Sequence, residues 1–448
     1  MHNPRFIITI LGLLLAGCAS GSREEKVALD RVRQTGARLH PGPDRPALTT
    51  GASLADYLHY ALLNHPQVEA AYDEWHAAAL AIAPARALPD PKLTFQADIA
   101  RSVTSLMPGL MFDVMAPGKR AAMAREAAAA SEVAYRRYVT RMLETAAGVK
   151  KNWVDLTALE ETLRLKRQML SLKEEAIRFS HAEHVTMHAM GSLDQLTQLL
   201  NEAGRLRLEI ANLEDERRAL RAGFKAALGI AHDGPDPAWP ECFAPPTAPT
   251  PDDDTFWRAV VAANPRLGEM RAMVEMSVAQ VAVEQKARTP DFAAGLMADL
   301  KMNPVLWRPL AEMTLPVWRK KIAATIAAAQ ARHDAAVARL RTEELMVAAD
   351  LARMTYMVRE ADRMVAYIDG TALPNLRQSY DTVAAAYGTG MTNFAMIPET
   401  QEMVLAMQVE RVAALRDREK TLADLSLLVA GEVPAGAPLP ARTAAATP

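Results

Sequence analysis

A long stretch without proline constrains the fold of this chain more than any other feature. Residues 119–187 contain no proline, and a helix over that span would be about 100 Å long. Apolar residues recur at every seventh position through this stretch and through the one that follows it. They are Met142, Val149, Leu156, Leu163, Leu170 and Ile177, then Leu199, Leu206, Leu213, Leu220 and Ala227. A strict seven-residue period predicts helices wound as left-handed coiled coils, with a bundle of several shorter helices as the alternative.

The chain also repeats itself. Four pairs of prolines or glycines share an offset of 199 residues: Pro66 with Pro265, Pro91 with Pro290, Pro117 with Pro316, and Gly191 with Gly390. Proline and glycine mark the ends of elements, so a shared offset is difficult to assign to chance. We therefore predict a tandem duplication, with each copy about 190 residues long.

The first residues have the pattern of an export signal. Arg5 precedes the short apolar run "FIITILGLLLAG", which fits a secretory signal and is too short for a stop-transfer helix. The run ends in "LAGC", which resembles the bacterial lipobox. That resemblance implies cleavage before Cys18 and lipidation of Cys18, and Ala19 after it favours sorting to the outer membrane. An ordinary signal peptide with an incidental cysteine is the alternative.

Six segments follow from these features. We expect a signal peptide at 1–17, a lipidated irregular segment at 18–52, a first repeat at 53–230, a proline-rich connector at 231–253, a second repeat at 254–430 and a disordered tail at 431–448. Beyond the signal, no window holds eighteen uncharged apolar residues, so we expect no transmembrane helix in the mature chain.

Each copy contains two runs in which apolar and polar residues alternate. The apolar positions are Leu93, Phe95, Ala97 and Ile99, then Leu110, Phe112 and Val114, and in the second copy Phe292, Leu296, Ala298 and Leu300, then Ala311, Met313 and Leu315. Alternation with a period of two predicts strands with one apolar face. The runs approach the roughly 9–11 residues that a tilted strand needs to cross a bilayer.

Four strands are too few to close a water-filled barrel. Open edges would expose unpaired backbone groups, which lipid does not tolerate, so the chain must borrow strands from other copies. Three chains would supply twelve strands, enough for a closed barrel with an aqueous lumen. We therefore expect a mainly α protein with a small β part. Duplicated coiled-coil helices would form an α-barrel tunnel, and four strands per chain would join a trimeric 12-stranded transmembrane β-barrel.

Composition and motifs argue against other classes of protein. The net charge of −2 gives no general attraction to nucleic acid. Besides the lipobox Cys18, Cys242 is the single cysteine, so no internal disulfide is expected. The sequence contains no HExxH, GxSxG, P-loop or Rossmann glycine pattern. We expect no enzyme and no cofactor.

Taken together, these features resemble the TolC family of outer-membrane efflux proteins. The resemblance rests on five sequence segments: "LADYLHYALLNHPQVEAA", "LPDPKLTF", "MAPGKRAAMAREAA", "LPVWRKKIAATIAAAQA" and "YGTGMTNFAMIPETQ". The resemblance covers nearly the whole mature chain. It implies a homotrimer whose tunnel crosses the periplasm and receives substrate from a periplasmic adaptor and an inner-membrane pump.

The resemblance also assigns positions at the periplasmic end of the tunnel. Gly191 and Gly390 would lie at the two helix–helix turns. In many relatives, acidic residues six and nine positions past the second glycine form a constricting ring, and here Met396 and Glu399 occupy these positions. A ring of Glu399 from three chains could select cations. For Asp194 two interpretations remain open, a contribution to this ring and a solvated acid at a helix start.

Methionines raise the question of a metal substrate. Met187, His188 and Met190 cluster beside the Gly191 turn, and further methionines lie in the second predicted strand and just before it. Thioether ligands favour soft Cu(I) or Ag(I), although methionine more often only fills helical seams.

We interpret the chain as an outer-membrane lipoprotein that forms the passive exit duct of a tripartite RND-type efflux system. Two alternatives remain open. One is a lipid-anchored periplasmic scaffold or adaptor without a pore, and the other is a duct dedicated to heavy-metal cations.

Overall fold

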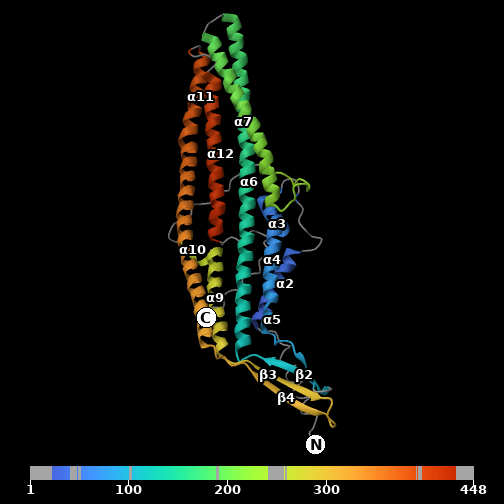
Figure 1. Ribbon diagram of the computed structural model, residues 1–448. Coiled ribbons are helices and arrows are strands. Elements are labelled where there is room, and N and C mark those ends of the chain that lie inside the picture. The colour runs from blue at the N-terminus through green and yellow to red at the C-terminus, as the bar shows by residue number, and fades with distance from the viewer. Residues whose placement is uncertain are drawn as a thin grey trace.

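The protein is a long rod with a small sheet at one end, as Figure 1 shows. The computed structural model describes residues 23–40, 48, 52–99, 103–187, 191–240, 257, 260–389, 391 and 396–429. Helices make up the rod, and two helical tips lie at the end opposite the sheet. Among the described residues, no helix is both long enough and apolar enough to cross a membrane.

The order of elements occurs twice along the chain. The first half contains α2 (Arg23–Leu39), α3 (Leu54–Asn64), α4 (Pro66–Leu80), α5 (Ile82–Arg86), β1 (Lys92–Ile99), β2 (Val103–Val114), α6 (Lys119–Met187) and α7 (Gly191–Ala227). The second half contains α9 (Pro265–Gln285), the 3-10 turn η1 (Lys286–Arg288), β3 (Phe292–Asp299), β4 (Leu306–Met313), α10 (Arg319–Tyr367), the π-helical turn η2 (Ile368–Ala372), α11 (Leu373–Gly388) and α12 (Met396–Val429). Each half is thus a helix, a pair of strands and a long helical hairpin, as the shared offset predicts.

The two copies begin their first long helix in the same way. Pro66 and Pro265 occupy the first turn of α4 and α9, where a missing N–H costs nothing. His65 Nδ1 accepts a hydrogen bond from the Gln67 N–H at 3.2 Å. Asn264 Oδ1 accepts one from the Leu267 N–H at 3.0 Å. These caps satisfy backbone donors that the helix itself leaves unpaired.

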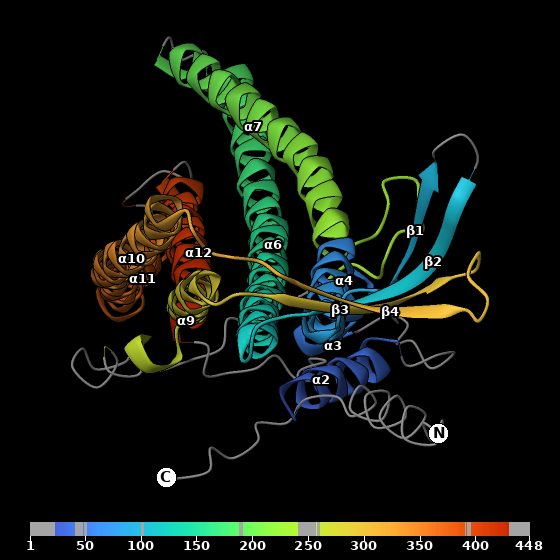
Figure 2. The same cartoon turned by 60° about the horizontal axis from the view of Figure 1, so that its bottom comes forward.

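Helix α6 is one continuous helix of 69 residues. The alternative of several shorter helices is therefore wrong. Four positions of its seven-residue series are almost completely buried: Met142, Val149, Leu156 and Leu163. Figure 2 shows why, because α6 lies at the centre with α4 and α7 on one side and α9 and α12 on the other.

The second copy does not repeat this continuity. Its counterpart of α6 is divided into α10 and α11 by the π-helical turn η2. Pro374 lies in the first turn of α11. Proline lacks the N–H that would continue the helix ladder and its ring crowds the preceding turn, so a local widening of the helix accommodates it. The two hairpins therefore differ in the continuity of their helices at this level.

The expectation of an irregular segment at 18–52 is wrong for residues 23–39, which form helix α2. Val32, Thr35 and Leu39 are buried on one side of this helix, and α2 contacts α4 and α6. The segment is polar on average, and its few apolar residues form a narrow stripe at helical spacing. Average composition therefore does not reveal this helix. Packing of that stripe on α4 stabilises the helix.

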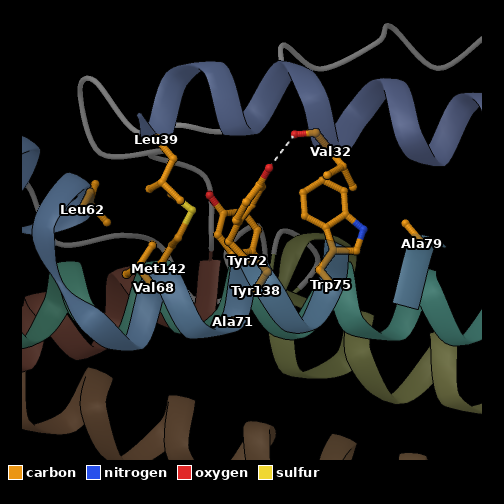
Figure 3. Close-up of a cluster of buried hydrophobic side chains, with 10 residues drawn as sticks. All are labelled: Val32, Leu39, Leu62, Val68, Ala71, Tyr72, Trp75, Ala79, Tyr138 and Met142. Atoms are coloured by element: carbon orange, nitrogen blue, oxygen red, sulfur yellow. Dashed lines mark hydrogen bonds between the residues drawn. The ribbon is translucent and has the colours of Figure 1, made fainter. Parts of the chain in front are cut away.

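Aromatic residues join α2, α4 and α6 into a core near the sheet end of the rod. Figure 3 shows Tyr72 and Trp75 of α4 between α2 and Tyr138 of α6. The rings of Trp75 and Tyr138 are stacked with centroids 5.6 Å apart. The Tyr72 hydroxyl donates to the Val32 carbonyl at 3.3 Å. The Tyr138 hydroxyl is buried, and none of the described residues forms a hydrogen bond with it.

The four strands form one antiparallel sheet in the order β1-β2-β3-β4. One face, which we call the outer face, consists of exposed apolar side chains. They are Leu93, Phe95, Leu106, Leu110, Phe112, Val114, Phe292, Leu296, Trp307 and Met313. The opposite, inner face includes buried residues such as Ser105, Met107, Met111, Met297 and Asp299. The predicted one-sided apolar strands are thus present.

Strand bounds differ from the expectation in detail. Strand β2 begins at Val103 and β4 at Leu306, earlier than the alternation indicates. Leu300 and Leu315, expected in strands, lie just beyond the ends of β3 and β4. Pro108 and Pro309 interrupt the sequence pattern, but both occupy positions within the strands.

The aromatic core generates a pair of contrasting predictions. Trp75→Ala should lower the free energy of unfolding by about 3–5 kcal/mol, because it leaves a large cavity in a closed cluster. Tyr138→Phe should leave it unchanged or raise it slightly, because the hydroxyl that is removed has no partner. Denaturant titration of the detergent-solubilised protein, followed by circular dichroism, measures both. A large loss in Tyr138→Phe would show that the hydroxyl is paired.

Candidate functional site

Three helices meet at a buried lysine in the tip half of the rod. Lys173 of α6 is 8% exposed. Its Nζ lies 2.7 Å from a carboxylate oxygen of Glu202 on α7 and 2.6 Å from one of Glu402 on α12. Lys173 therefore joins the hairpin of the first copy to the hairpin of the second at this level.

The charges of this junction stabilise one another. Burial disfavours the charge of Lys173, but hydrogen bonds to Glu202 and Glu402 outweigh this effect and raise its pKa. The hydrogen bond from Lys173 in turn lowers the pKa of Glu202. Lys173 and Glu202 are thus both charged at neutral pH. Removing the lysine would leave two carboxylates facing each other, which is costly where solvent is partly excluded.

Glu399 lines the same shallow cavity as the junction. The cavity is bounded by Lys166, Met169, Lys173, Glu202, Arg205, Leu206, Glu209, Glu399, Glu402, Met403 and Ala406. Helix α12 begins at Met396, so Pro398 and Glu399 both lie in its first turn. A proline is tolerated there because the first N–H groups of a helix have no partner within it. The dipole of the helix also favours the negative charge of Glu399.

The other predicted gate residues lie near this cavity but do not join it. Met396 is 40% exposed at the start of α12. Asp194 is exposed in the first turn of α7. Lys173 places Glu202 and Glu402 at the same level, so Asp194 lies about 7 Å further toward the tip than Glu399. Among the described residues, no contact joins Asp194 to Glu399.

Several predicted residues lie at or beyond the limits of the described chain. Gly191 begins α7, as a helix–helix turn requires, whereas Gly390, His188, Met190 and Cys18 lie outside the described residues. Met187 ends α6, but its side chain is not described. Within the described ranges, no three His, Cys, Asp or Glu side chains lie close enough together to hold a metal ion.

Sequence analysis did not single out Lys173, Glu202 or Glu402. A signal for Lys173 was present, because it follows Leu170 of the seven-residue series by three residues, a position that faces the seam of a coiled coil. A charged residue there requires a partner. The identity of that partner depends on how the two hairpins pack, which the sequence pattern does not give.

Two further ion pairs fasten α12 to α6 closer to the sheet. Lys420 lies 2.8 Å from Asp155, and Lys151 lies 2.7 Å from Asp424. Glu402 and Lys420 are eighteen residues apart on α12, which corresponds to about 27 Å along the helix. Helix α12 is therefore held to α6 at separate levels, and among the ion pairs of the described residues that join these two helices, the Lys173 junction is the one nearest the tip.

The inner face of the sheet has polar and thioether groups. Lys92 of β1 lies 2.7 Å from Asp113 of β2. Met107 and Met111 of β2 and Met297 of β3 are buried on this face. Gly109 pairs with Met297 and Gly295 with Met111, so each glycine leaves room for the methionine opposite it. A Cβ on Gly109 would lie 2.4 Å from Cγ of Met297.

Comparisons with known proteins agree with this architecture. Residues 258–431 match the family described as outer membrane efflux protein. The Campylobacter jejuni CmeC outer membrane channel superposes with a TM-score of 0.70 at 12% identity, over 85% of this chain and 87% of that one. The open state of the Neisseria gonorrhoeae MtrE outer membrane channel gives 0.69 at 14% identity, over 84% and 89%.

A third solved channel has a similar fold over a larger share of this chain. The outer-membrane channel OprN gives a TM-score of 0.72 at 14% identity, over 89% of this chain and 95% of that one. No curated protein sequence matches the chain. The predicted resemblance and the predicted fold class are confirmed. The chain therefore contains an outer membrane efflux protein domain in its second half, and its described length has the fold of the outer membrane channels.

Proposed function

We propose that this protein is the outer-membrane exit duct of a tripartite RND-type efflux system. Small molecules or ions would pass through it from the periplasm to the exterior without an energy source of its own. Three copies would form the duct, Cys18 would carry a lipid, and a periplasmic adaptor and an inner-membrane pump would deliver substrate to the helical tips.

One observation carries this proposal. The sheet exposes an apolar outer face and two open edges, at the end of a rod whose single helix α6 spans 69 residues. An exposed apolar sheet face of this kind requires a lipid or protein environment, and open edges in lipid require strand partners. A scaffold without a pore has no use for such a sheet. The rod has the length to cross an aqueous compartment, at about 100 Å for α6 alone.

Gating would occur at the Lys173 junction. If the tip of the α11–α12 hairpin moves away from α6 and α7, the pair between Lys173 and Glu402 must break. The pairs formed by Lys420 and Lys151 lie about 27 Å or more away along α12 and would remain as the hinge. Packed helices have discrete alternative arrangements, so the junction would stabilise the closed one.

Selection of ions would depend on Glu399. It lies in the first turn of α12, beside the junction and exposed. Three copies around an axis would place three carboxylates at the tip of the tunnel, which attracts cations and repels anions. Asp194 would add a weaker contribution nearer the entrance.

The primary test is single-channel conductance of the purified protein in a planar bilayer, together with its oligomer mass. The wild type should be a trimer with discrete, cation-preferring steps. Glu399→Ala should lower the preference for cations severalfold, because it removes the charge ring. Glu410→Ala, an exposed acid further along α12, is the control and should change little. A monomer without conductance would favour the lipid-anchored scaffold.

The gate is tested by removing its lysine. Lys173→Met should raise the open probability and make cells more sensitive to large antibiotics, because Glu202 and Glu402 then repel each other. Lys420→Met is the matched control, since it removes a similar pair far from the tip. Equal opening in both variants would contradict a gate at the junction. Acid should weaken the bond between Lys173 and Glu202 only below pH 4.5, the ordinary pKa of glutamate, because the hydrogen bond from Lys173 lowers the pKa of Glu202.

A second candidate substrate class is supported by the inner face of the sheet. Met107, Met111 and Met297 lie on it within two neighbouring strands. Thioethers bind Cu(I) and Ag(I) weakly and reversibly enough to suit a duct. The second candidate is therefore a duct for soft heavy-metal cations.

Replacing these three methionines by leucine separates the two candidates. The change conserves most of the volume and removes the soft ligands. For a soft-metal duct, cells that depend on this protein should lose tolerance to silver and keep tolerance to organic drugs. Leucine at the exposed Met357 and Met364 of α10 is the control. Unchanged silver tolerance would remove the metal candidate.

A further inference from the structure

A group of cations lies where the helices of copy two meet the sheet. Arg319, Lys320 and Lys321 begin α10 and are all exposed. Lys286 and Arg288 belong to the turn η1, which precedes β3. Within the part of the chain that the structure describes, no acidic side chain forms an ion pair with any of these residues. We call this group the basic patch.

The sheet brings the two segments of the basic patch to the same place. Phe292 of β3 lies opposite Met313 of β4, and the Thr314 N–H donates to the Asp291 carbonyl at 2.8 Å. The chain therefore enters β3 from η1 and leaves β4 toward α10 at neighbouring points. Figure 1 shows the corresponding ends of α9 and α10 side by side next to the sheet. Two elements thus contribute to one patch.

Exposed apolar residues lead from the outer face of the sheet into the basic patch. Leu315, Val317 and Trp318 connect β4 to α10, and the side chain of Trp318 is 75% exposed. Val317 and Trp318 line one hollow together with the three cations that begin α10. Tryptophan beside cations is typical of the level at which the apolar core of a bilayer meets its headgroups. The basic patch is therefore continuous with the face that we expect to contact lipid.

The corresponding region of the first copy carries less free charge. At the offset of 199 residues, Lys320 corresponds to Ala121 and Trp318 corresponds to Lys119. Lys119 lies 2.5 Å from Asp291, so its charge is neutralised within the chain. The charges of the basic patch have no such internal partner and are available to an external anion.

The basic patch is unfavourable without an anion. Adjacent like charges repel one another, and the dipole of α10 disfavours cations in its first turn, where Arg319, Lys320 and Lys321 lie. No acidic residue lies in that turn to compensate. An anion that covers the patch would reduce both costs.

We propose that the basic patch binds the headgroups of anionic phospholipids in the leaflet that faces the helical rod. This inference rests on the membrane insertion of the proposed function and adds a lipid preference to it. The cations contact the phosphate, Trp318 lies at the level of the headgroups, and the acyl chains lie along the outer face beside Met313. A free phosphate ion has no chain to cover that face, so a lipid is the expected source of the anion.

Native mass spectrometry of the full-length protein in neutral detergent tests the preference. The protein is titrated with phosphatidylglycerol or with phosphatidylcholine of the same acyl chains. The wild-type trimer should bind phosphatidylglycerol about tenfold more tightly, because each nearby cation strengthens the attraction to an anionic headgroup. Combining Arg319→Gln, Lys320→Gln and Lys321→Gln should abolish this preference and leave the binding of phosphatidylcholine unchanged.

A matched control is available on the same helix. Arg332, Arg339 and Arg341 are exposed on α10, and they begin about 20 Å further along the rod than Arg319. Combining Arg332→Gln, Arg339→Gln and Arg341→Gln removes the same charge and should leave the preference for phosphatidylglycerol intact. Equal loss in both triple variants would show that only net charge matters, which would overturn the basic patch.

The remaining outcomes separate this inference from the proposed function. A conducting trimer without a preference for phosphatidylglycerol would overturn the inference and leave the duct intact. Dissociation of the trimer in the patch variant alone would assign these cations to a contact between copies instead. Competition by soluble glycerol phosphate would assign them to a free anion. A monomer without conductance would overturn the duct, and this inference with it.

Discussion

The structure depends on the continuous apolar surface of α6. Helices α2, α3, α4, α5, α7, α9 and α12 all contact it, and the buried positions of its seven-residue series run from Met142 to Leu163. A helix this long is not stable by itself in water, so its neighbours and α6 stabilise one another. The absence of proline between residues 119 and 187 is what permits the arrangement, because one break would divide the rod into two parts with independent directions.

The second half of the rod repeats the fold of the first half. The two copies differ in the continuity of their helices and in the pairing of their charges. The first hairpin is continuous, whereas Pro374 and the π-helical turn interrupt the second. The first copy pairs Lys92 with Asp113, whereas the second has two acids at the corresponding positions. A repeated fold with unequal charges can form one kind of contact within the chain and another kind between chains.

Buried charge gives the packing of the hairpins its register. Apolar seams alone allow neighbouring helices to slide, since one leucine replaces another at small cost. Lys173 allows no such shift, because it must lie between Glu202 and Glu402. A polar group at a seam position specifies register at a cost in stability. The proposed gate places the separation of the two hairpins at this level of the rod.

The sequence by itself determined the long helices, the duplication and the one-faced strands, because each depends on local periodicity or on proline and glycine at element ends. It also determined the start of α12 closely enough to place Glu399 in its first turn. Only the tertiary structure decided that residues 23–39 form a helix, since their narrow apolar stripe is stable only against α4. It alone brought Lys173 to Glu202 and Glu402, and Met107 and Met111 to Met297. These contacts join residues far apart along the chain, and no local pattern encodes the packing that brings them together.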